Sequence, residues 1–389
     1  MEGPGAAGIL PAIGTRGDNI VKVFRVRLVR ALSVAVAAIA IAAFSEVCLK
    51  NPHVDDFLSF YTGASALASG HLADLYREQR YAPTPLDLPF IRPPVTALFF
   101  EPFTALPFVP AFWLWACIQA IVFLYFLFRA QSVTMKPAAA CLFPPVILGI
   151  GHGQDCLLFL WVLGASYSLL RRDKNLGGGI VLGLGLLKFH LFLLWPIALI
   201  LQKRWRTLMG FCLVGVVLVA GSFSLVGVAG VMDYLSLLID PKLTPSTPGV
   251  FREVGVASIL DNAGISWVPL RIAIDLSLTV TALYALRGRN VEWLFIIVPT
   301  LALLVAPHAL YYDPTMLLFS LWLVISMPGA QALQAMAFVL ASPTVFLSPM
   351  MERPWPAASG VALLVFLFAA LRRMGRDIVE PGRERKLVL

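Results

Sequence analysis

Long apolar runs, separated by short polar or basic turns, recur along nearly the whole chain and constrain its fold more than any other feature. A helix that spans a membrane needs roughly 17 to 25 mostly apolar residues, and fewer where it is broken or ends in polar turns buried in protein. The sequence therefore predicts an all-α, polytopic membrane protein. About twelve spans are expected, at residues 31–49, 109–128, 138–151, 155–170, 176–187, 190–202, 207–229, 268–286, 293–306, 311–327, 331–347 and 357–371.

The charge content supports the membrane class. Charged residues make up 13% of the chain, against about 25% in soluble domains. No long polar segment marks a separate soluble domain, so we expect one transmembrane domain at 31–371, between a basic N-terminal segment at 1–30 and a basic tail at 372–389. The net charge of +8 lies in short clusters between apolar runs, which indicates membrane orientation rather than nucleic-acid binding.

The basic clusters fall on one side of the membrane if every predicted span crosses it. That side holds most of the 30 lysines and arginines, and the opposite side holds most of the 22 acidic residues. Cytoplasmic loops of membrane proteins are enriched in lysine and arginine. Both termini are therefore predicted to be cytoplasmic.

The apolar stretch at 176–202 is interrupted only by Lys188-Phe189-His190 and has two interpretations. One long helix with a lysine in its middle would place the basic turn at 202–206 on the outer side, away from the other basic clusters. Two short helices that meet at Lys188 keep this turn with those clusters. We therefore expect two helices here.

Two long loops are expected on the outer side, at 50–108 and 230–267. Pro102, Pro107 and Pro110 exclude one straight helix in the first loop. We expect short helices that lie in the membrane interface there. The second loop is rich in proline and threonine and predicts a lid or a binding loop.

Polar residues that are rare in membrane segments occur at four turns, all on the predicted outer side. They are Asp55 and Asp56; His152, Gln154 and Asp155; Lys188 and His190; and His308, Tyr311, Tyr312 and Asp313. A charged group near a membrane is costly unless it has a partner or a function. Four such turns on one face, opposite plain arginine and lysine clusters, indicate a functional site.

Each of these groups also has a purely structural interpretation. The aspartate pair can be a solvated loop start, and residues 152–154 can cap a broken helix. Lys188 can extend its amine to the lipid headgroups, and residues 308–313 can form an internally hydrogen-bonded turn. The combination of the four groups carries more weight than any one of them.

Several short motifs follow one another in a fixed order between about residues 54 and 318. They are Asp56-Phe57 with Tyr61 and Gly70…Leu75-Tyr76; Pro93-Pro94…Pro102…Leu106-Pro107; Gly153-Gln154; Gly179…Gly183-Leu184…Lys188; and Pro307-His308…Tyr312-Asp313. This ordered set resembles glycosyltransferase family 87, whose members are polytopic enzymes with the C-type glycosyltransferase fold. Arg92, the Asp155-Cys156 pair and Phe189 depart from the family pattern.

The resemblance implies that the domain at 31–371 is catalytic. The implied reaction is an inverting transfer of a hexose, mannose-like, from a polyprenyl-phosphate sugar to a hydroxyl of a lipid or glycan acceptor. An aspartate of the first outer loop is the implied general base. Asp56 takes this role because it precedes the phenylalanine, and its neighbour Asp55 is the alternative. The implied location is the periplasmic face of a bacterial plasma membrane, in contact with membrane lipids.

The chemistry of this transfer suggests roles for the other polar residues. A phosphate leaving group needs cations or hydrogen-bond donors rather than a general acid. The candidates for binding it are Lys188, His190, His308 and Arg92, and the candidates for binding the sugar or the acceptor are His152, Gln154, Tyr312 and Asp313. No cofactor and no essential metal are expected, because no acidic metal-ligand cluster is evident. The five cysteines lack the spacing of metal ligands and are expected to be buried thiols.

Two other classes of function compete with the enzyme. A transporter or flippase of lipid-linked sugars would show inverted repeats and polar residues near the middle of the membrane, whereas this sequence shows no repeat and has its polar residues at helix ends. A non-catalytic scaffold would not explain four polar turns on one face. The enzyme is therefore the preferred interpretation.

Overall fold

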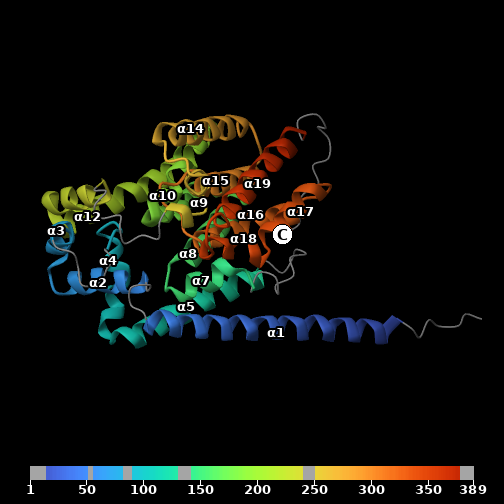
Figure 1. Cartoon of the computed structure of the whole chain (residues 1–389), viewed down its shortest axis with the longest axis horizontal. Coiled ribbons are helices and arrows are strands. Elements are labelled where there is room, and N and C mark those ends of the chain that lie inside the picture. The colour runs from blue at the N-terminus through green and yellow to red at the C-terminus, as the bar shows by residue number, and fades with distance from the viewer. Residues whose placement is uncertain (1–14, 51–55, 82–89, 130–141, 240–249, 377–389) are drawn as a thin grey trace, which may run out of the picture.

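The computed structural model describes residues 15–50, 56–81, 90–129, 142–239 and 250–376, and every regular element in these ranges is a helix (Figure 1). The α-helices are α1 (Thr15–Lys50), α2 (Asp56–Ala68), α3 (Leu72–Tyr81), α4 (Thr96–Phe100), α5 (Phe108–Arg129), α7 (Pro144–Gly151), α8 (Cys156–Arg171), α9 (Asn175–Gly183), α10 (Phe189–Phe192), α11 (Leu194–Leu201), α12 (Trp205–Ile239), α13 (Val256–Asn262), α14 (Val268–Ala285), α15 (Val291–Val305), α16 (Leu317–Ile325), α17 (Gln331–Leu340), α18 (Pro343–Leu347) and α19 (Ala357–Arg376). Short 3₁₀ helices are η2 (Glu101–Ala105), η4 (Leu184–Lys188), η6 (Val250–Arg252), η7 (Asp313–Met316) and η8 (Ser348–Met350). The expected all-α class is confirmed.

Five helices of the described residues are long and apolar enough to cross a membrane. They are Phe108–Leu127, Asn175–Phe192, Trp205–Ile239, Val268–Ala285 and Ala357–Arg376, and the bent pair Gln331–Leu340 with Pro343–Met350 makes a sixth if it counts as one span. Shorter apolar helices accompany them at Val34–Val47, Cys156–Arg171, Val291–Val305 and Asp313–Ile325. A polytopic membrane protein is thus supported, while the number twelve and the C-type architecture stay predictions.

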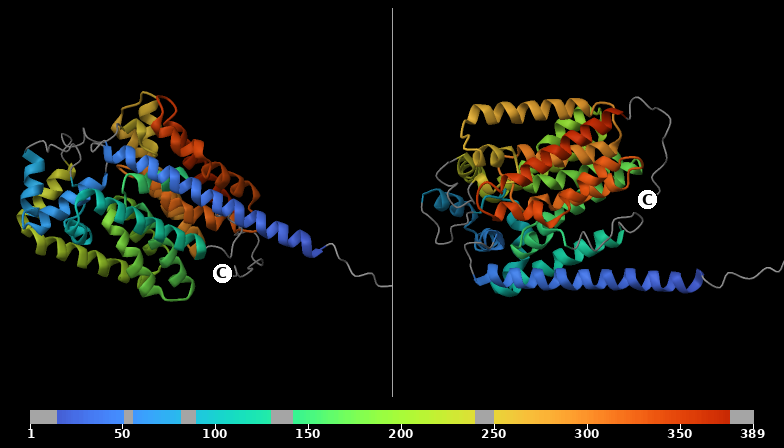
Figure 2. Two further views of the ribbon diagram at one scale, coloured as in Figure 1. Left: turned by 90° about the horizontal axis from the view of Figure 1, so that it is seen from below. Right: turned by 45° about the vertical axis from the view of Figure 1, so that its right-hand side comes forward.

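The long helices extend past the limits that the apolar runs predict. α1 begins at Thr15 and has 36 residues; it packs on α7 along one edge of the molecule (Figure 2). α12 continues to Ile239, so the second outer loop does not begin at residue 230 as expected. Its backbone breaks at Gly227, where φ is +65°, a conformation that glycine adopts without a steric penalty. Hydropathy misses this extension because the added turns are less apolar than the span itself.

α9 and α12 lie side by side and run in the same direction. A Cβ atom on Gly179, near the start of α9, would lie 2.0 Å from the carbonyl oxygen of Thr207, near the start of α12. Further along both helices, a Cβ on Gly215 would lie 3.2 Å from Leu186. We call α9 together with the following η4 the α9 stretch (residues 175–188). Only residues 189–204 join its end to the start of α12, so this segment must return along the bundle.

The turn occurs at Lys188, whose backbone leaves helical geometry with φ −120° and ψ 58°. α10 and α11 then lead back to Trp205. This geometry agrees with two short helices that meet at Lys188, although the stretch Asn175–Phe192 also has the length and composition of a single span. The lysine therefore lies at the far end of a hairpin from the basic turn at 202–206.

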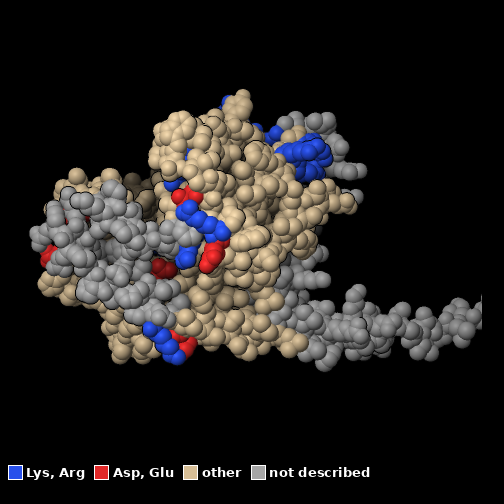
Figure 3. Space-filling model, in the orientation of Figure 1, with Lys and Arg blue, Asp and Glu red and all other residues tan. Residues whose placement is uncertain are grey.

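The bundle has two distinct ends, which we call the polar end and the basic end. The polar end carries Asp56, His152, Lys188 and Asp313, and α8 leads from it to Arg171 at the basic end. At the basic end, Arg171 contacts Glu292 of α15 at 2.7 Å. Basic side chains also gather near the C-terminal end of α19, on a face that is otherwise mostly uncharged (Figure 3).

The helices nearest the polar site are short, and those around them are long. α8 has 16 residues and α15 has 15, whereas α12 has 35 and α1 has 36. The short helices α2, α3 and α4 gather at the polar end, beside α12 (Figure 1). Short helices were expected in the first outer loop, and the structure shows them there.

An aromatic cluster holds α2 in place at the polar end. The rings of Phe60 and Phe100 stack with centroids 4.6 Å apart, and Phe57 is fully buried against Phe100 and Phe112. Trp115 of α5 donates a hydrogen bond from its indole N–H to the carbonyl oxygen of Gly153 at 2.8 Å. Burial of aromatic side chains is a large apolar contribution, and here it fixes α2 against the turn at 152–155.

Candidate functional site

Asp56 is the first residue of α2 and is held against the turn that follows α7. The backbone N–H of Phe57 donates a hydrogen bond to the carbonyl oxygen of His152 at 3.1 Å. Gly153 has φ +66°, and a Cβ there would lie 2.5 Å from the Cβ of Phe57. Glycine therefore permits both the turn and the close approach of α2. As a result the Asp56 carboxylate lies 4.0 Å from Nδ1 of His152.

His152 links this carboxylate to the loop before α16. Its Nε2 lies 2.9 Å from the hydroxyl of Tyr311, and its ring packs edge-on against Phe44 of α1 with centroids 5.0 Å apart. The His152 side chain is 2% exposed, whereas that of Asp56 is 22% exposed. The arrangement places an accessible carboxylate next to a buried and oriented imidazole, which is a geometry suited to accepting a proton from a bound hydroxyl.

A network of four buried charges lies beside this carboxylate. Arg92 contacts Asp155 at 2.8 Å, and Lys188 forms a close ion pair with Asp313 and lies 3.9 Å from Asp155. All four side chains are less than a tenth exposed. Charges buried at this depth are tolerated because each cation has a carboxylate partner. Two cations and two carboxylates leave the network without net charge.

Hydrogen bonds from neighbouring residues fix the geometry of the network. The Gln154 amide accepts from Arg92 at 3.3 Å and donates to the Tyr312 hydroxyl at 3.1 Å. The backbone N–H of Leu310 donates to Asp313 at 2.8 Å, and the Lys188 amine lies 5.3 Å from the centre of the Tyr312 ring. Because Gln154 and Tyr312 are close in sequence to His152 and Tyr311, the network and the Asp56–His152 pair form one site.

Arg92 keeps its charge at this site although it is buried. Burial alone lowers the pKa of its guanidinium, but the carboxylates of Asp155 and Asp313 outweigh that effect and the net pKa is raised. Its Nη1 also donates to the backbone carbonyl of Leu187 at 3.4 Å. Arg92 therefore connects the segment before α4 to the end of the α9 stretch.

The other two candidate histidines, His190 and His308, occupy different surroundings. Nε2 of His190 is buried and has no hydrogen-bond partner among the described residues. His308 is bound through Nδ1 to Glu253 at 3.1 Å, and its side chain is 28% exposed. His190 thus offers an unused polar atom beside Lys188, while His308 lies with Glu253 at the margin.

The structure brings together most of the residues that the sequence proposes. Those that meet are Asp56, Arg92, His152, Gln154, Lys188, Tyr312 and Asp313. Asp55 lies outside the described residues. Asp155 and Tyr311 had no specific role predicted from the sequence, and Glu253 was not singled out. An acidic or phenolic side chain inside a polar turn of a membrane protein is the signal for the first two, and Glu253 carries no comparable local signal.

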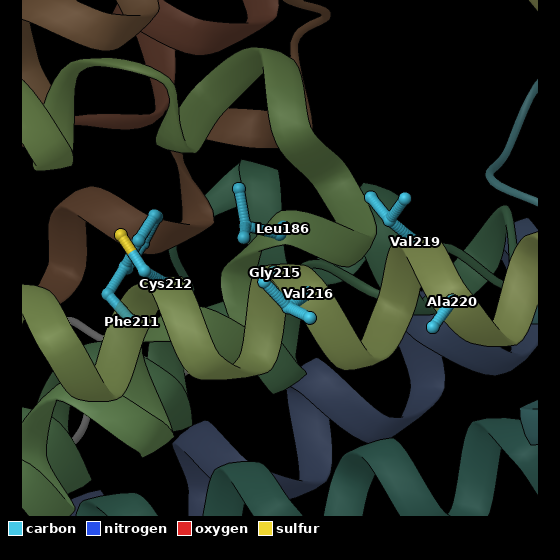
Figure 4. A pocket seen from close by; sticks show the side chains of 7 residues that line it. All are labelled: Leu186, Phe211, Cys212, Gly215, Val216, Val219 and Ala220. Atoms are coloured by element: carbon cyan, nitrogen blue, oxygen red, sulfur yellow. The ribbon is translucent and has the colours of Figure 1, made fainter.

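An apolar groove of about 490 Å³ runs along α12 beside η4 (Figure 4). Figure 4 shows Leu186 facing a row of side chains on α12. The lining residues are Leu186, Phe211, Cys212, Gly215, Val216, Val219 and Ala220. Leu186 precedes Leu187, whose carbonyl oxygen accepts from Arg92, so one wall of the groove adjoins the charge network.

No three His, Cys, Asp or Glu side chains of the described ranges gather in a way that could hold a metal ion.

Comparison with known proteins gives one family. A family model described as glycosyltransferase family 87 matches residues 90–307, more than half of the chain. The matched range includes Arg92, the turn at 152–155 and Lys188, while Asp56 precedes it and Asp313 follows it. Neither a curated protein nor a solved structure gives a significant match.

Proposed function

This chain belongs to glycosyltransferase family 87, and from that premise we propose that it transfers a hexose, mannose-like, from a polyprenyl-phosphate sugar to a hydroxyl of a lipid or glycan acceptor. The observation that carries the proposal is the position of Asp56. This carboxylate is partly exposed, lies 4.0 Å from His152 and begins a short helix next to the buried network of two cations and two carboxylates. The proposed base is thus adjacent to the cations that would stabilise the leaving phosphate.

Asp56 acts as the general base in this proposal. The acceptor oxygen forms a bond to the anomeric carbon while its proton passes to the Asp56 carboxylate. The bond from the anomeric carbon to the phosphate oxygen breaks on the opposite face, and its electron pair leaves with the lipid phosphate. Proton removal by a positioned carboxylate contributes roughly 10²- to 10⁴-fold to the rate. The Tyr311 hydroxyl holds the His152 imidazole beside this carboxylate.

The departing phosphate is stabilised by protein cations and donors. Arg92 and Lys188 are held by Asp155 and Asp313, so a phosphate competes with these carboxylates for the same groups. Nε2 of His190 has no such competitor among the described residues and is proposed to make the first hydrogen bond. The proposed contacts of the sugar and the acceptor are His152, Gln154, Tyr312 and Asp313, with His308 as a further phosphate contact. No metal or cofactor is assigned to these steps.

The polyprenyl chain of the donor is proposed to lie in the groove beside α12. Its lining is almost entirely apolar, and Leu186 at its wall is two residues from Lys188. A chain in this groove would therefore keep its phosphate within reach of Lys188 and Arg92. The hydrophobic effect would hold the lipid roughly in proportion to the apolar area that it covers.

The proposal also includes an orientation. The polar end is expected to face the periplasm of a bacterial plasma membrane, with both termini in the cytoplasm. Reporter fusions after Asp56, Lys188 and His308 are expected to report the outside. A cytoplasmic report from any of the three would contradict a common site on the outer face.

The test of the proposed reaction uses the purified full chain in lipid vesicles. Radiolabelled polyprenyl-phosphate monosaccharides of several sugars are supplied with native membrane extract as acceptor. Labelled product that disappears in the Asp56→Ala variant supports the transfer and the base together. Movement of the donor across the bilayer without product would instead support a flippase of lipid-linked sugars.

A further inference from the structure

Two helices begin next to each other at the basic end, and both point their N-termini toward the same space. α9 begins at Asn175 and α12 at Trp205, and the two helices run in parallel. The residues Asp173 and Lys203 just before them have φ +57° and +54°, so each preceding helix ends abruptly. The first N–H groups of a helix have no partner inside it and form the positive end of its dipole. Two such ends converge here.

A cavity of about 430 Å³ lies at this convergence. It is lined by Asn175, Lys203, Arg204, Trp205, Arg206 and Thr207. Nε of Arg204 and the hydroxyl of Thr207 are buried without a hydrogen-bond partner in the described part of the chain, and Thr207 is 0% exposed. Buried polar groups are nearly always hydrogen-bonded in folded proteins. The unpartnered atoms therefore point to an acceptor that binds in the cavity.

The positive charge around the cavity favours an anion as its ligand. The two adjoining turns carry six cations: Arg171, Arg172, Lys174, Lys203, Arg204 and Arg206. The carboxylates that face Arg204 are Glu292 and Asp173, and Glu292 is already engaged by Arg171 at 2.7 Å and by the Tyr167 hydroxyl at 3.2 Å. Helix N-termini combined with unpaired arginine and lysine are a common binding site for phosphate groups.

The surface beside the cavity indicates a lipid rather than a free ion. Trp205 is 59% exposed, and Met209 and Leu213 on the next turns of α12 are 58% and 53% exposed. Tryptophan is enriched where a membrane protein meets the headgroup layer. An apolar helix face that continues from the cavity suits acyl chains attached to a phosphate.

We propose that this cavity binds the phosphate group of an anionic membrane lipid, such as a phosphatidylglycerol headgroup, at the end of the protein opposite the transfer site. The bound phosphate would accept hydrogen bonds from Arg204, from Thr207 and from the first N–H groups of α12. Because α9 and α12 begin here and the α9 stretch ends at Lys188, the lipid fixes the base of the hairpin that carries Lys188. This site is independent of the proposed sugar transfer.

The test measures lipid binding by the full chain directly. Native mass spectrometry of protein released from phosphatidylcholine nanodiscs with and without phosphatidylglycerol counts retained lipids. Arg204→Gln with Arg206→Gln is compared with Arg372→Gln and Arg376→Gln, which removes the same charge from exposed arginines at the end of α19. We expect about a tenfold loss of retained phosphatidylglycerol in the first variant and little change in the second.

Several outcomes would overturn the proposal. An equal loss of retained phosphatidylglycerol in both double variants would mean that the lipid is attracted diffusely to basic side chains. If the parent protein retains no phosphatidylglycerol, the site does not exist. A rise in melting temperature with inorganic phosphate alone, equal to that with phosphatidylglycerol, assigns the cavity to free phosphate. Thr207→Val keeps the shape of the side chain and the charge of the protein. It therefore tests the site even if the double arginine variant does not fold. It is expected to weaken retention about threefold, and an unchanged value contradicts the site.

Discussion

Both ends of the helix bundle carry arginine and lysine, yet the polar end buries them against carboxylates while the basic end leaves most of them in the open. The side chains of Arg92 and Asp155 are 9% and 4% exposed. At the basic end Arg172 and Arg206 are exposed, and Arg171 is 31% exposed beside its buried partner Glu292. The clusters at the basic end are what sequence counting detects, because number alone sets membrane orientation. Burial and pairing, which counting does not detect, distinguish the polar end, where we place the proposed reaction.

The energetic consequences of the two arrangements differ. Buried charges have lost most of their hydration, and removing one partner leaves the other without compensation. Exposed pairs are screened by water and contribute little to stability. Matched substitutions at the two ends therefore measure the contrast directly.

The largest expected effect is the loss of transfer in Asp56→Asn. The change keeps the shape of the side chain but removes the proton acceptor, so kcat should fall roughly 10²- to 10⁴-fold. Asp173→Asn makes the same change at the basic end, where the backbone has φ +57°, a conformation that asparagine tolerates. Steady-state kinetics that show equal activity for the two variants would remove Asp56 from the reaction.

A smaller but still large effect is expected on stability when Asp313 becomes Asn. Lys188 is then buried without its main partner, and the free energy of unfolding should fall by about 3–5 kcal/mol. The measurement is reversible unfolding in mixed micelles. Lys188→Met combined with Asp313→Leu removes both charges and should recover much of the loss. Recovery that fails to appear would mean that packing, rather than the charge pair, sets stability there.

The groove along α12 offers a test of whether the lipid chain of the donor binds there. Val216 lines the groove and is 65% exposed, while its neighbour Val217 is 60% exposed and is not part of the lining. Val216→Trp should raise KM for the polyprenyl-phosphate sugar roughly tenfold with little change in kcat, the pattern of lost uniform binding. Val217→Trp is the control. Equal KM values for the two variants would place the lipid elsewhere.

The smallest effect is expected at the basic end. Arg172→Gln removes an exposed cation from this end, and the loss of stability should be no more than about 1 kcal/mol. The same unfolding assay applies. A loss as large as that of Asp313→Asn would erase the distinction between the two ends.

Much of the site could be predicted from the sequence because alternating spans place their turns on two sides. Asp56, His152, Lys188 and Asp313 were expected together for this reason, and the structure places them at one end of the bundle although they are far apart in the chain. The identity of the partners could not be predicted in the same way. The pairing of Arg92 with Asp155 depends on the rotation of each helix about its axis and on its depth in the bundle. A hydropathy profile gives neither the rotation nor the depth.

The fold was predicted in class but less well in extent. Apolar composition marks where a helix can cross a membrane, but helices continue into less apolar segments, as α12 does up to Ile239. The 8-residue α7 shows the opposite case: a longer apolar run was expected there, and Pro144 begins the helix instead, since proline favours the first helical position. Local backbone chemistry therefore set boundaries that hydropathy left open.

The contrast between short inner helices and long outer ones has a consequence for how substrates arrive. α8, with 16 residues, rises about 24 Å, less than the roughly 30 Å of a hydrocarbon layer. A site carried by such helices, next to longer ones such as α12, is expected to lie below the level of the lipid headgroups. Thicker bilayers would increase this depth, because lipid and protein adjust to each other's length. Membrane thickness is therefore expected to change the rate of the proposed transfer, because the acceptor would have to reach farther into the bilayer while the lipid-borne sugar is already at depth.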